Sequence, residues 1–303
     1  MAAVTNSQTV TVKALIFGIN GQDGYYLSRL CHEKGIEYIG ISRSEGDWIR
    51  GDVSDFVFVR ELIKKHQPDY IFHLAANSTT HHGALFENHE TISTGSVAIL
   101  EAVWKESSHS KVFLTGSGIQ FENSGKAIAE TDEFAPTSAY SVARIQSVYA
   151  ARYFRSLGLK VYVGYLFHHE SIFRKQHHVS TQIVEAIKRI QQGSNEVLEI
   201  GDLSVQKEWG YAADIAAAIL TLVQQDSIFE ATIGTGKAHS IQQWVVLCFE
   251  HIGLDWQDYV SSRPFFASDY PILVSNPATI QQLGWSPTVS IDELAKKMML
   301  GEL

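Results

Sequence analysis

The chain has 303 residues, of which 45% are hydrophobic and 19% are charged, and its formal net charge is −9 at pH 7. A globular chain of this size holds one large domain or two interlocked ones, and its acidic balance argues against nucleic acid or an anionic membrane as a partner. Two distant cysteines, Cys31 and Cys248, exclude a disulfide framework and a thiolate zinc site.

The N-terminal segment carries no charged flank followed by an apolar core, so it does not resemble a secretory signal. No stretch approaches the roughly 18 consecutive apolar residues of a membrane span. We therefore expect a cytoplasmic protein with no membrane partner.

Apolar segments of strand length alternate with amphipathic segments of helix length through the first half of the chain. The predicted strands cover residues 12–17, 38–41, 48–52, 70–74, 111–115 and 161–167. The first predicted helix places Leu27, Leu30 and Cys31 on one face and ends near Gly35. The later ones cover residues 56–66, 90–104 and 138–157. This alternation predicts an α/β fold of the Rossmann type, with a doubly wound parallel sheet covered on both faces.

The regular alternation ends after residue 167. A polar, histidine-rich loop, a helix over 179–192 and a strand over 197–200 follow. The sequence predicts a Rossmann domain at 12–167, to which residues 209–235 return, and a smaller C-terminal substrate domain at 168–208 and 236–303.

A glycine-rich turn lies between the first predicted strand and the first predicted helix. Gly18, Gly21 and Gly24 stand where a backbone must approach a pyrophosphate, and the helix that follows would direct its N-terminal N–H groups and dipole at the negative charge. The turn and the strands that follow predict a nicotinamide dinucleotide as cofactor.

The end of the second predicted strand distinguishes NADP from NAD. A site for NAD usually has Asp or Glu there for the ribose 2′-hydroxyl, whereas a 2′-phosphate prefers Arg. The sequence has Arg43 between Ser42 and Ser44, and the first carboxylate is Glu45. We expect NADP, with NAD the less favoured alternative.

Three motifs together resemble the extended short-chain dehydrogenase/reductase (NAD-dependent epimerase/dehydratase) family. They are the GxxGxxG spacing at residues 18–24, the sequence Leu-Ala-Ala at 74–76, and Tyr140 with Arg144 at the spacing of the family's YxxxK motif. The resemblance implies a cofactor site formed by Gly18, Asn20, Gly21, Gln22, Asp23, Gly24, Arg43, Asp52, Val53, Leu74, Ala75, Ala76, Tyr140 and Arg144.

Within that family the chain is similar to the GDP-mannose 4,6-dehydratases along nearly its whole length. The similar segments include residues 14–27, 67–69, 166–171, 207–210 and 284–287. The resemblance implies a nucleotide-diphosphate sugar as substrate, with hydride transfer at sugar C4. It also implies a homodimer or higher oligomer through helices 90–104 and 138–157. The implied substrate contacts are Asn77, Ser117, His168, Val179, Lys207 and Arg263.

The active site departs from this pattern at two positions. Tyr140 is the implied acid/base, but Arg144 replaces the lysine that lowers the tyrosine pKa, and a guanidinium cannot join a proton relay. Ser117 can replace the family's threonine hydroxyl. The glutamate that serves dehydration is replaced by Ile119, and Glu122 lies three residues out of register.

Three functions remain open: a dehydratase, a reductase or epimerase of a nucleotide-linked 4-keto-hexose, and a non-catalytic protein that binds NADP and sugar nucleotide. If the role of the missing glutamate has moved, His81 or His169 is the candidate base. Adjacent histidines on an extended chain point in opposite directions, so the histidine pairs predict no metal site.

Overall fold

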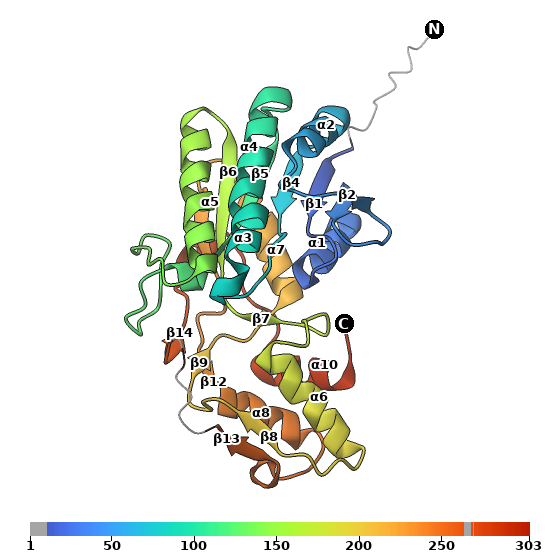
Figure 1. Cartoon of the computed structure of the whole chain (residues 1–303), viewed down its shortest axis with the longest axis vertical. Helices are drawn as coiled ribbons and strands as arrows, with labels where there is room; N and C mark the ends of the chain where they lie inside the picture. Colours follow the sequence, from blue (N-terminus) through green and yellow to red (C-terminus); the bar gives the residue numbers. More distant parts are fainter. Residues whose placement is uncertain (1–10, 264–267, 269) are drawn as a thin grey trace.

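A computed structural model describes residues 11–263, 268 and 270–303 as two lobes joined side by side (Figure 1). The larger lobe contains a sheet of seven parallel strands in the order β11-β6-β5-β4-β1-β2-β3. Its strands are β1 (Lys13–Phe17), β2 (Glu37–Ser42), β3 (Ile49–Arg50), β4 (Tyr70–His73), β5 (Lys111–Ser117), β6 (Lys160–Leu166) and β11 (Glu230–Ile233).

The strands of this sheet are apolar on both sides because both faces are covered. In β1, Ala14 and Ile16 are buried in one hydrophobic core, while Leu15 and Phe17 are buried in the other. Successive side chains of a strand point to opposite faces, so a strand covered on both faces becomes a continuous apolar segment.

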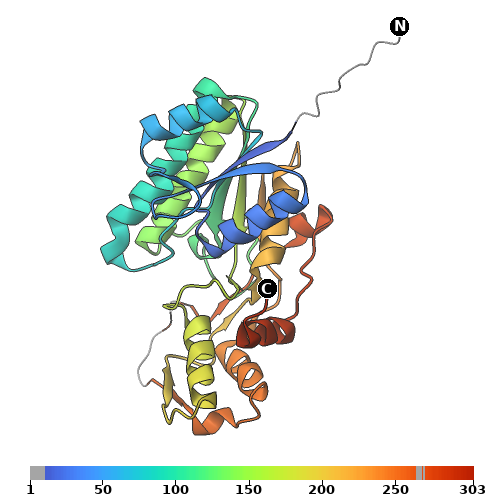
Figure 2. The ribbon, with the colours of Figure 1, turned by 90° about the vertical axis from the view of Figure 1, so that its right-hand side faces the viewer.

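Helices pack on both faces of the sheet, as Figure 2 shows. One face carries α2 (Phe56–His66), α4 (Gly95–Glu106) and α5 (Ala139–Ser156), and the other carries α1 (Gln22–Glu33) and α7 (Ala212–Val223). The predicted doubly wound parallel α/β fold is confirmed.

The helix predicted over 90–104 differs from the structure at its start. The chain is already helical in α3 (Leu85–Asn88), passes through a π-helical turn at His89–Thr94 and continues as α4. A π turn adds a residue to the helical repeat, which simple periodicity does not register. At the end of this turn the helix packs closely on the segment between β3 and α2, because a Cβ at Gly95 would lie 2.8 Å from Val53 Cγ1.

The smaller lobe is built from helices and short strands. Its helices are α6 (Val179–Gln191), α8 (Ile241–Glu250), α9 (Ala278–Gln282), which packs back against β11, and α10 (Ile291–Leu300). Its strands are β7 (His169–Glu170), β8 (Leu198–Ile200), β9 (Gln206–Lys207), β10 (Gly210–Tyr211), β12 (His239–Ser240), β13 (Val260–Ser262) and β14 (Ile272–Leu273). Over the described residues, single 3₁₀ turns lie at His82–Ala84 and Gly118–Gln120 in the larger lobe and at Trp256–Asp258 in the smaller lobe.

The two lobes share one hydrophobic core. The core beneath α1 and α7 continues into the smaller lobe, where the rings of Trp209 and Trp244 stack with centroids 4.4 Å apart. The chain also returns to the sheet through α7 and β11 after forming β7–β10. The division into two domains stays a prediction. Across the described part of the chain, no helix has the length and apolar character needed to cross a bilayer.

Candidate cofactor and sugar-nucleotide site

A large cleft lies where the two lobes meet, at the carboxyl ends of β1, β2, β4, β5 and β6. Its volume is about 1490 Å³. Pockets for single small ligands usually measure about 300–1,000 Å³, so this cleft has room for a dinucleotide and a second ligand. In open α/β sheets, ligands bind at this end of the strands.

The glycine turn forms the floor of the cleft, and its geometry requires glycine. Gly18 has φ +93°, and a Cβ there would lie 2.6 Å from the Ala75 backbone nitrogen. A Cβ at Gly24 would collide with the Gly18 carbonyl oxygen. Gly21 is the N-cap of α1, so the first N–H groups of that helix are presented to the cleft. This arrangement fits a pyrophosphate.

The predicted cofactor residues lie around this turn, with one exception. Asp52 does not line the cleft: its carboxylate accepts hydrogen bonds from the backbone N–H and the hydroxyl of Ser54, each at 2.9 Å. The residues that do line the cleft are Gly18, Asn20, Gly21, Gln22, Asp23, Gly24, Arg43, Val53, Leu74, Ala75, Ala76, Tyr140 and Arg144.

Arg43 lines the cleft beyond the end of β2, but it already has an acidic partner. Its Nη2 donates to Glu87 Oε1 at 3.1 Å, and Glu87 Oε2 accepts from Asn77 Nδ2 at 2.8 Å. The Arg43 hydrogen bond, followed by the Asn77 hydrogen bond, lowers the pKa of Glu87. Nothing in the sequence near Arg43 indicated this partner, which comes from α3.

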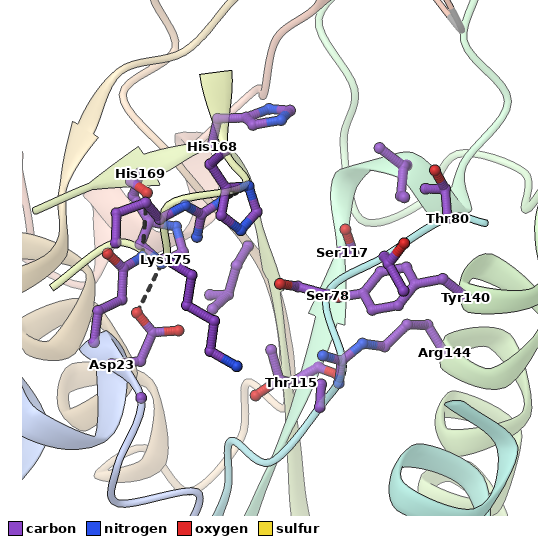
Figure 3. A pocket seen from close by; sticks show the side chains of 18 of the residues that line it. Asp23, Ser78, Thr80, Thr115, Ser117, Tyr140, Arg144, His168, His169 and Lys175 are labelled. Atoms are coloured by element: carbon purple, nitrogen blue, oxygen red, sulfur yellow. Dashed lines mark hydrogen bonds and ion pairs between the residues drawn. The ribbon is translucent and has the colours of Figure 1, made fainter. Parts of the chain in front are cut away.

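Tyr140, Arg144 and Ser117 lie on one wall of the cleft (Figure 3). Tyr140 is at the second position of α5, and Arg144 is one helical turn further on, with its guanidinium carbon 5.0 Å from the centre of the Tyr140 ring. Arg144 is buried, and its Nη1 donates to the Thr115 carbonyl. The sequence predicted this grouping, because a spacing of four residues places both side chains on one helix face.

Ser117 ends β5 with its hydroxyl oriented by local hydrogen bonds. Its Oγ accepts from the Gln120 backbone N–H, and the Gln120 side chain in turn accepts from the Ser117 N–H at 2.8 Å. The hydroxyl proton of Ser117 is therefore available for donation to a ligand oxygen.

The carboxylates that line the described part of the cleft are Asp23, Glu122 and Asp202. Asp23 is paired with His169, and Asp202 accepts from the Ser204 hydroxyl at 2.7 Å. Glu122 is exposed. Beside Tyr140 the wall is instead apolar, because Ile119 packs with Tyr140 and Ala143.

His169 and Asp23 form a buried pair that joins β7 to the glycine turn (Figure 3). His169 Nε2 lies 2.8 Å from Asp23 Oδ1, and its Nδ1 lies 2.7 Å from the Phe167 carbonyl oxygen. Burial alone would lower the pKa of His169, but the Asp23 carboxylate raises it above its ordinary value. Both ring nitrogens face oxygen acceptors, an arrangement that favours the protonated imidazole.

This pairing argues against one of the two candidate bases. His169 has no free ring nitrogen to accept a proton from a substrate, whereas His81 lines the cleft and is exposed. Over the ranges that the structure describes, no group of three or more His, Cys, Asp or Glu side chains converges as a metal site would require.

A buried cationic cluster lines the opposite lobe of the cleft. Lys207 is 6% exposed, its Nζ lies 4.4 Å from the centre of the Trp209 ring, and it is 3.9 Å from Glu170 Oε1. Burial lowers the pKa of Lys207 to about 8, although Glu170 acts in the opposite direction. Arg174 contacts the other Glu170 oxygen at 3.3 Å. This cluster suits a bound anion.

The structure places some of the predicted substrate residues in the cleft lining and others outside it. Ser117, His168, Val179 and Lys207 line the cleft. Asn77 is outside the lining and donates to Glu87. The Arg263 side chain is exposed and is also outside the lining, so its contact with substrate stays a prediction.

The loop between β7 and α6 supplies basic cleft residues outside the predicted cofactor and substrate sets. They are Arg174, Lys175, His177 and His178. Figure 3 shows Lys175 extending toward the space between Asp23 and Thr115. The sequence feature that could have indicated them is the run of basic and histidine residues after β7. Only the tertiary structure places this run in the same cleft as the glycine turn.

Comparison with known proteins agrees with this geometry. The family described as GDP-mannose 4,6 dehydratase matches residues 15–298. GDP-mannose 4,6 dehydratase 1 of Arabidopsis thaliana is 28% identical over 320 residues, which cover 94% of this chain and 88% of that protein.

Solved structures resemble the chain over nearly its full length. A UDP-glucose 4-epimerase of Thermotoga maritima, solved with UDP-glucose, has a TM-score of 0.84 at 23% identity and covers 95% of this chain and 98% of its own. RMD of Pseudomonas aeruginosa, complexed with NADPH, has a TM-score of 0.82 at 18% identity and covers 96% and 97%. Neighbours with this fold include complexes with NAD as well as NADPH. They confirm the extended short-chain dehydrogenase/reductase fold.

Proposed function

This chain belongs to the GDP-mannose 4,6 dehydratase family, and on that premise we propose that it exchanges a hydride between NADP and carbon 4 of a hexose linked to a nucleoside diphosphate. We propose reduction or epimerisation at that carbon as its reaction. The observation that carries the proposal is the cleft wall beside the glycine turn, where Tyr140 and Ser117 stand next to Ile119.

NADP, when bound, supplies or accepts the hydride. The N-terminus of α1 and the glycine turn would hold its pyrophosphate, and Arg43 would face its 2′-phosphate. The solved neighbour that holds NADPH supports this cofactor class.

Tyr140 handles the proton in this proposal. Its phenol oxygen gives a proton to the sugar O4 during reduction and removes it during oxidation. The Arg144 guanidinium lies 5.0 Å from the ring centre, so its positive charge stands beside the tyrosine. Ser117 donates a hydrogen bond to a sugar oxygen and holds the reacting carbon in place.

The side chain at position 119 favours reduction or epimerisation over dehydration. Dehydration across C5 and C6 needs a base and an acid beside these carbons, and an isoleucine transfers no proton. Reduction and epimerisation need the tyrosine, the hydroxyl and the cofactor alone. Dehydration is the second candidate, because the chain belongs to the dehydratase family. In that reaction Glu122 on the cleft wall would transfer the proton.

The substrate diphosphate would lie on the smaller lobe. Lys207 and Arg174 offer positive charge there, and His168 and Val179 line the same part of the cleft. The solved epimerase that holds UDP-glucose supports a nucleotide sugar as the ligand class.

Mass spectrometry of the products tests the reaction. The protein is incubated with NADPH and a nucleotide-linked 4-keto-hexose, and separately with NADP and GDP-mannose. A gain of two hydrogens on the keto sugar supports reduction, and an unchanged mass with an altered sugar supports epimerisation. Loss of one water from GDP-mannose would instead establish dehydration, and tight binding without any product would establish the non-catalytic alternative.

We also propose a homodimer through α4 and α5. These helices expose large apolar side chains on the outer face of the larger lobe, namely Val97, Trp104, Tyr149 and Tyr153. Large apolar side chains exposed on two adjacent helices are typical of a protein interface. Sedimentation equilibrium at micromolar concentration should give twice the chain mass, and Tyr153→Glu should give the monomer.

A further inference from the structure

The cation proposed for the cofactor 2′-phosphate is shared with a carboxylate. Arg43 follows β2, and its Nη2 donates to Glu87 Oε1 at 3.1 Å across 44 residues of sequence. Asn77 holds the other Glu87 oxygen at 2.8 Å, which fixes the carboxylate in place beside the guanidinium.

Two other cations lie near this pair. Lys175 lines the cleft from the smaller lobe, and its charge acts on the Glu87 carboxylate in addition to Arg43. Arg50 donates to the Arg43 carbonyl at 3.1 Å and to Glu45 at 3.2 Å. The other polar groups nearby are neutral: Ser42 and Ser44 hydroxyls lie 3.1 Å apart, and Ser44 accepts from Asn20.

NADP and NAD would interact differently with the Arg43–Glu87 pair. A 2′-phosphate carries nearly two negative charges at pH 7 and would compete with Glu87 for Arg43. A ribose 2′-hydroxyl is neutral and can donate a hydrogen bond to a carboxylate.

We propose that Glu87 is a cofactor-selectivity residue that competes with the 2′-phosphate for Arg43 and so weakens binding of NADP relative to NAD. The inference rests on the proposed function, because it assumes that a dinucleotide lies in this cleft with its adenosine ribose at the end of β2. Arg43 then favours NADP, while Glu87 limits that preference and keeps NAD an accepted cofactor.

The size of the effect follows from exposure. The Arg43 and Glu87 side chains are 53% and 44% exposed. Water and salt screen half-exposed charges, so we expect a change of about three- to tenfold in affinity rather than a complete switch.

Fluorescence titration with NADPH and NADH measures the selectivity directly. Glu87→Gln removes the charge but keeps the shape and a hydrogen-bonding oxygen for Asn77. We expect it to tighten NADPH about three- to tenfold and to leave NADH unchanged or weaker, with a larger change at low salt. Glu90→Gln is the matched control: it removes the same charge from an exposed residue three positions from the Arg43 partner Glu87, and it should change neither affinity.

A double variant tests whether the effect runs through Arg43. In an Arg43→Ala background, Glu87→Gln should improve NADPH binding by a much smaller factor than in the wild type. Equal factors in both backgrounds would overturn the sharing of Arg43.

Two further outcomes would also overturn the inference. One is an unchanged ratio of NADPH to NADH affinity in Glu87→Gln, and the other is weaker NADPH binding, which would make Glu87 a support for Arg43. A wild-type protein that binds neither dinucleotide would refute the proposed function itself, and this result is distinct from an unchanged ratio.

Discussion

The cleft has a cofactor half around the glycine turn and a reacting half around Tyr140 and Ser117, and the sequence constrains these two halves in different ways. On the cofactor half, Gly18 and Gly24 are required by the backbone itself, since a Cβ at either would meet main-chain atoms. On the reacting half, side chains rather than backbone define the wall, and here Arg144 and Ile119 stand where the family resemblance predicts a lysine and a glutamate. Backbone geometry can therefore preserve the cofactor site of a fold, while single side-chain substitutions can alter the reaction that the fold supports.

Replacing the proposed acid/base should give the largest effect on the reacting half. Tyr140→Phe removes the phenol proton, so we expect kcat to fall by about a hundred- to ten-thousandfold while NADPH binding is retained. Steady-state kinetics and NADPH titration check this. Tyr149→Phe, on the exposed face of the same helix, is the control. Full activity in Tyr140→Phe would remove this tyrosine from the mechanism.

Adding one methyl group to the glycine turn should damage the cofactor half. Gly18→Ala places a Cβ 2.6 Å from the Ala75 nitrogen at φ +93°. We expect the free energy of unfolding to fall by about 2–4 kcal/mol and dinucleotide binding to weaken. Urea unfolding and NADPH titration measure both quantities.

The Gly35→Ala variant separates the energetic cost of a positive φ from the cost of a steric clash with the backbone. Gly35 has φ +71°, and no atom lies within 4 Å of the position a Cβ would take, so its alanine variant should lose only about 1 kcal/mol of unfolding free energy and bind cofactor normally. Equal losses in the two variants would show that the approach of Ala75 to Gly18 has no energetic consequence.

The His169–Asp23 pair, which joins β7 to the glycine turn, should make the free energy of unfolding depend on pH. The pKa of His169 is raised, so its contribution is complete below its ordinary pKa of 6.5 and is lost as pH rises through the folded value. Burial alone would raise the pKa of Asp23, but His169 lowers it, so that contribution is lost only in acid, below 3.8. We expect the unfolding free energy of wild type to decline above neutral pH by about 1–2 kcal/mol relative to His169→Gln. Parallel pH profiles would contradict the ion pair.

The smallest predicted effect concerns the anion site of the smaller lobe. Burial lowers the pKa of Lys207 to about 8, so its charge is lost as pH rises from 7 to 9. Nucleotide-sugar affinity should weaken about three- to tenfold over that range, because a neutral amine attracts a diphosphate less than an ammonium does. Calorimetric titration measures this, and Lys207→Arg should remove the dependence. A dependence that persists in Lys207→Arg would assign it to another group.

The sequence by itself determined the sheet and the cofactor half. Alternation of apolar segments predicted the doubly wound fold, and the glycine spacing predicted the turn, because both patterns depend on residues close together in the chain. The pairing of Tyr140 with Arg144 was predictable for the same reason, since four residues make one helical turn.

Only the tertiary structure decided which distant side chains meet. Glu87 reaches Arg43 from α3, 44 residues further along the chain. His169 meets Asp23 across 146 residues because the segments that follow β6 and β1 both enter the cleft at the carboxyl edge of the sheet, although β5 and β4 separate these two strands. Such contacts depend on strand order and on burial in a shared core. These long-range terms establish the neighbours of Arg43 and the charge of His169, which no local pattern in the chain encodes.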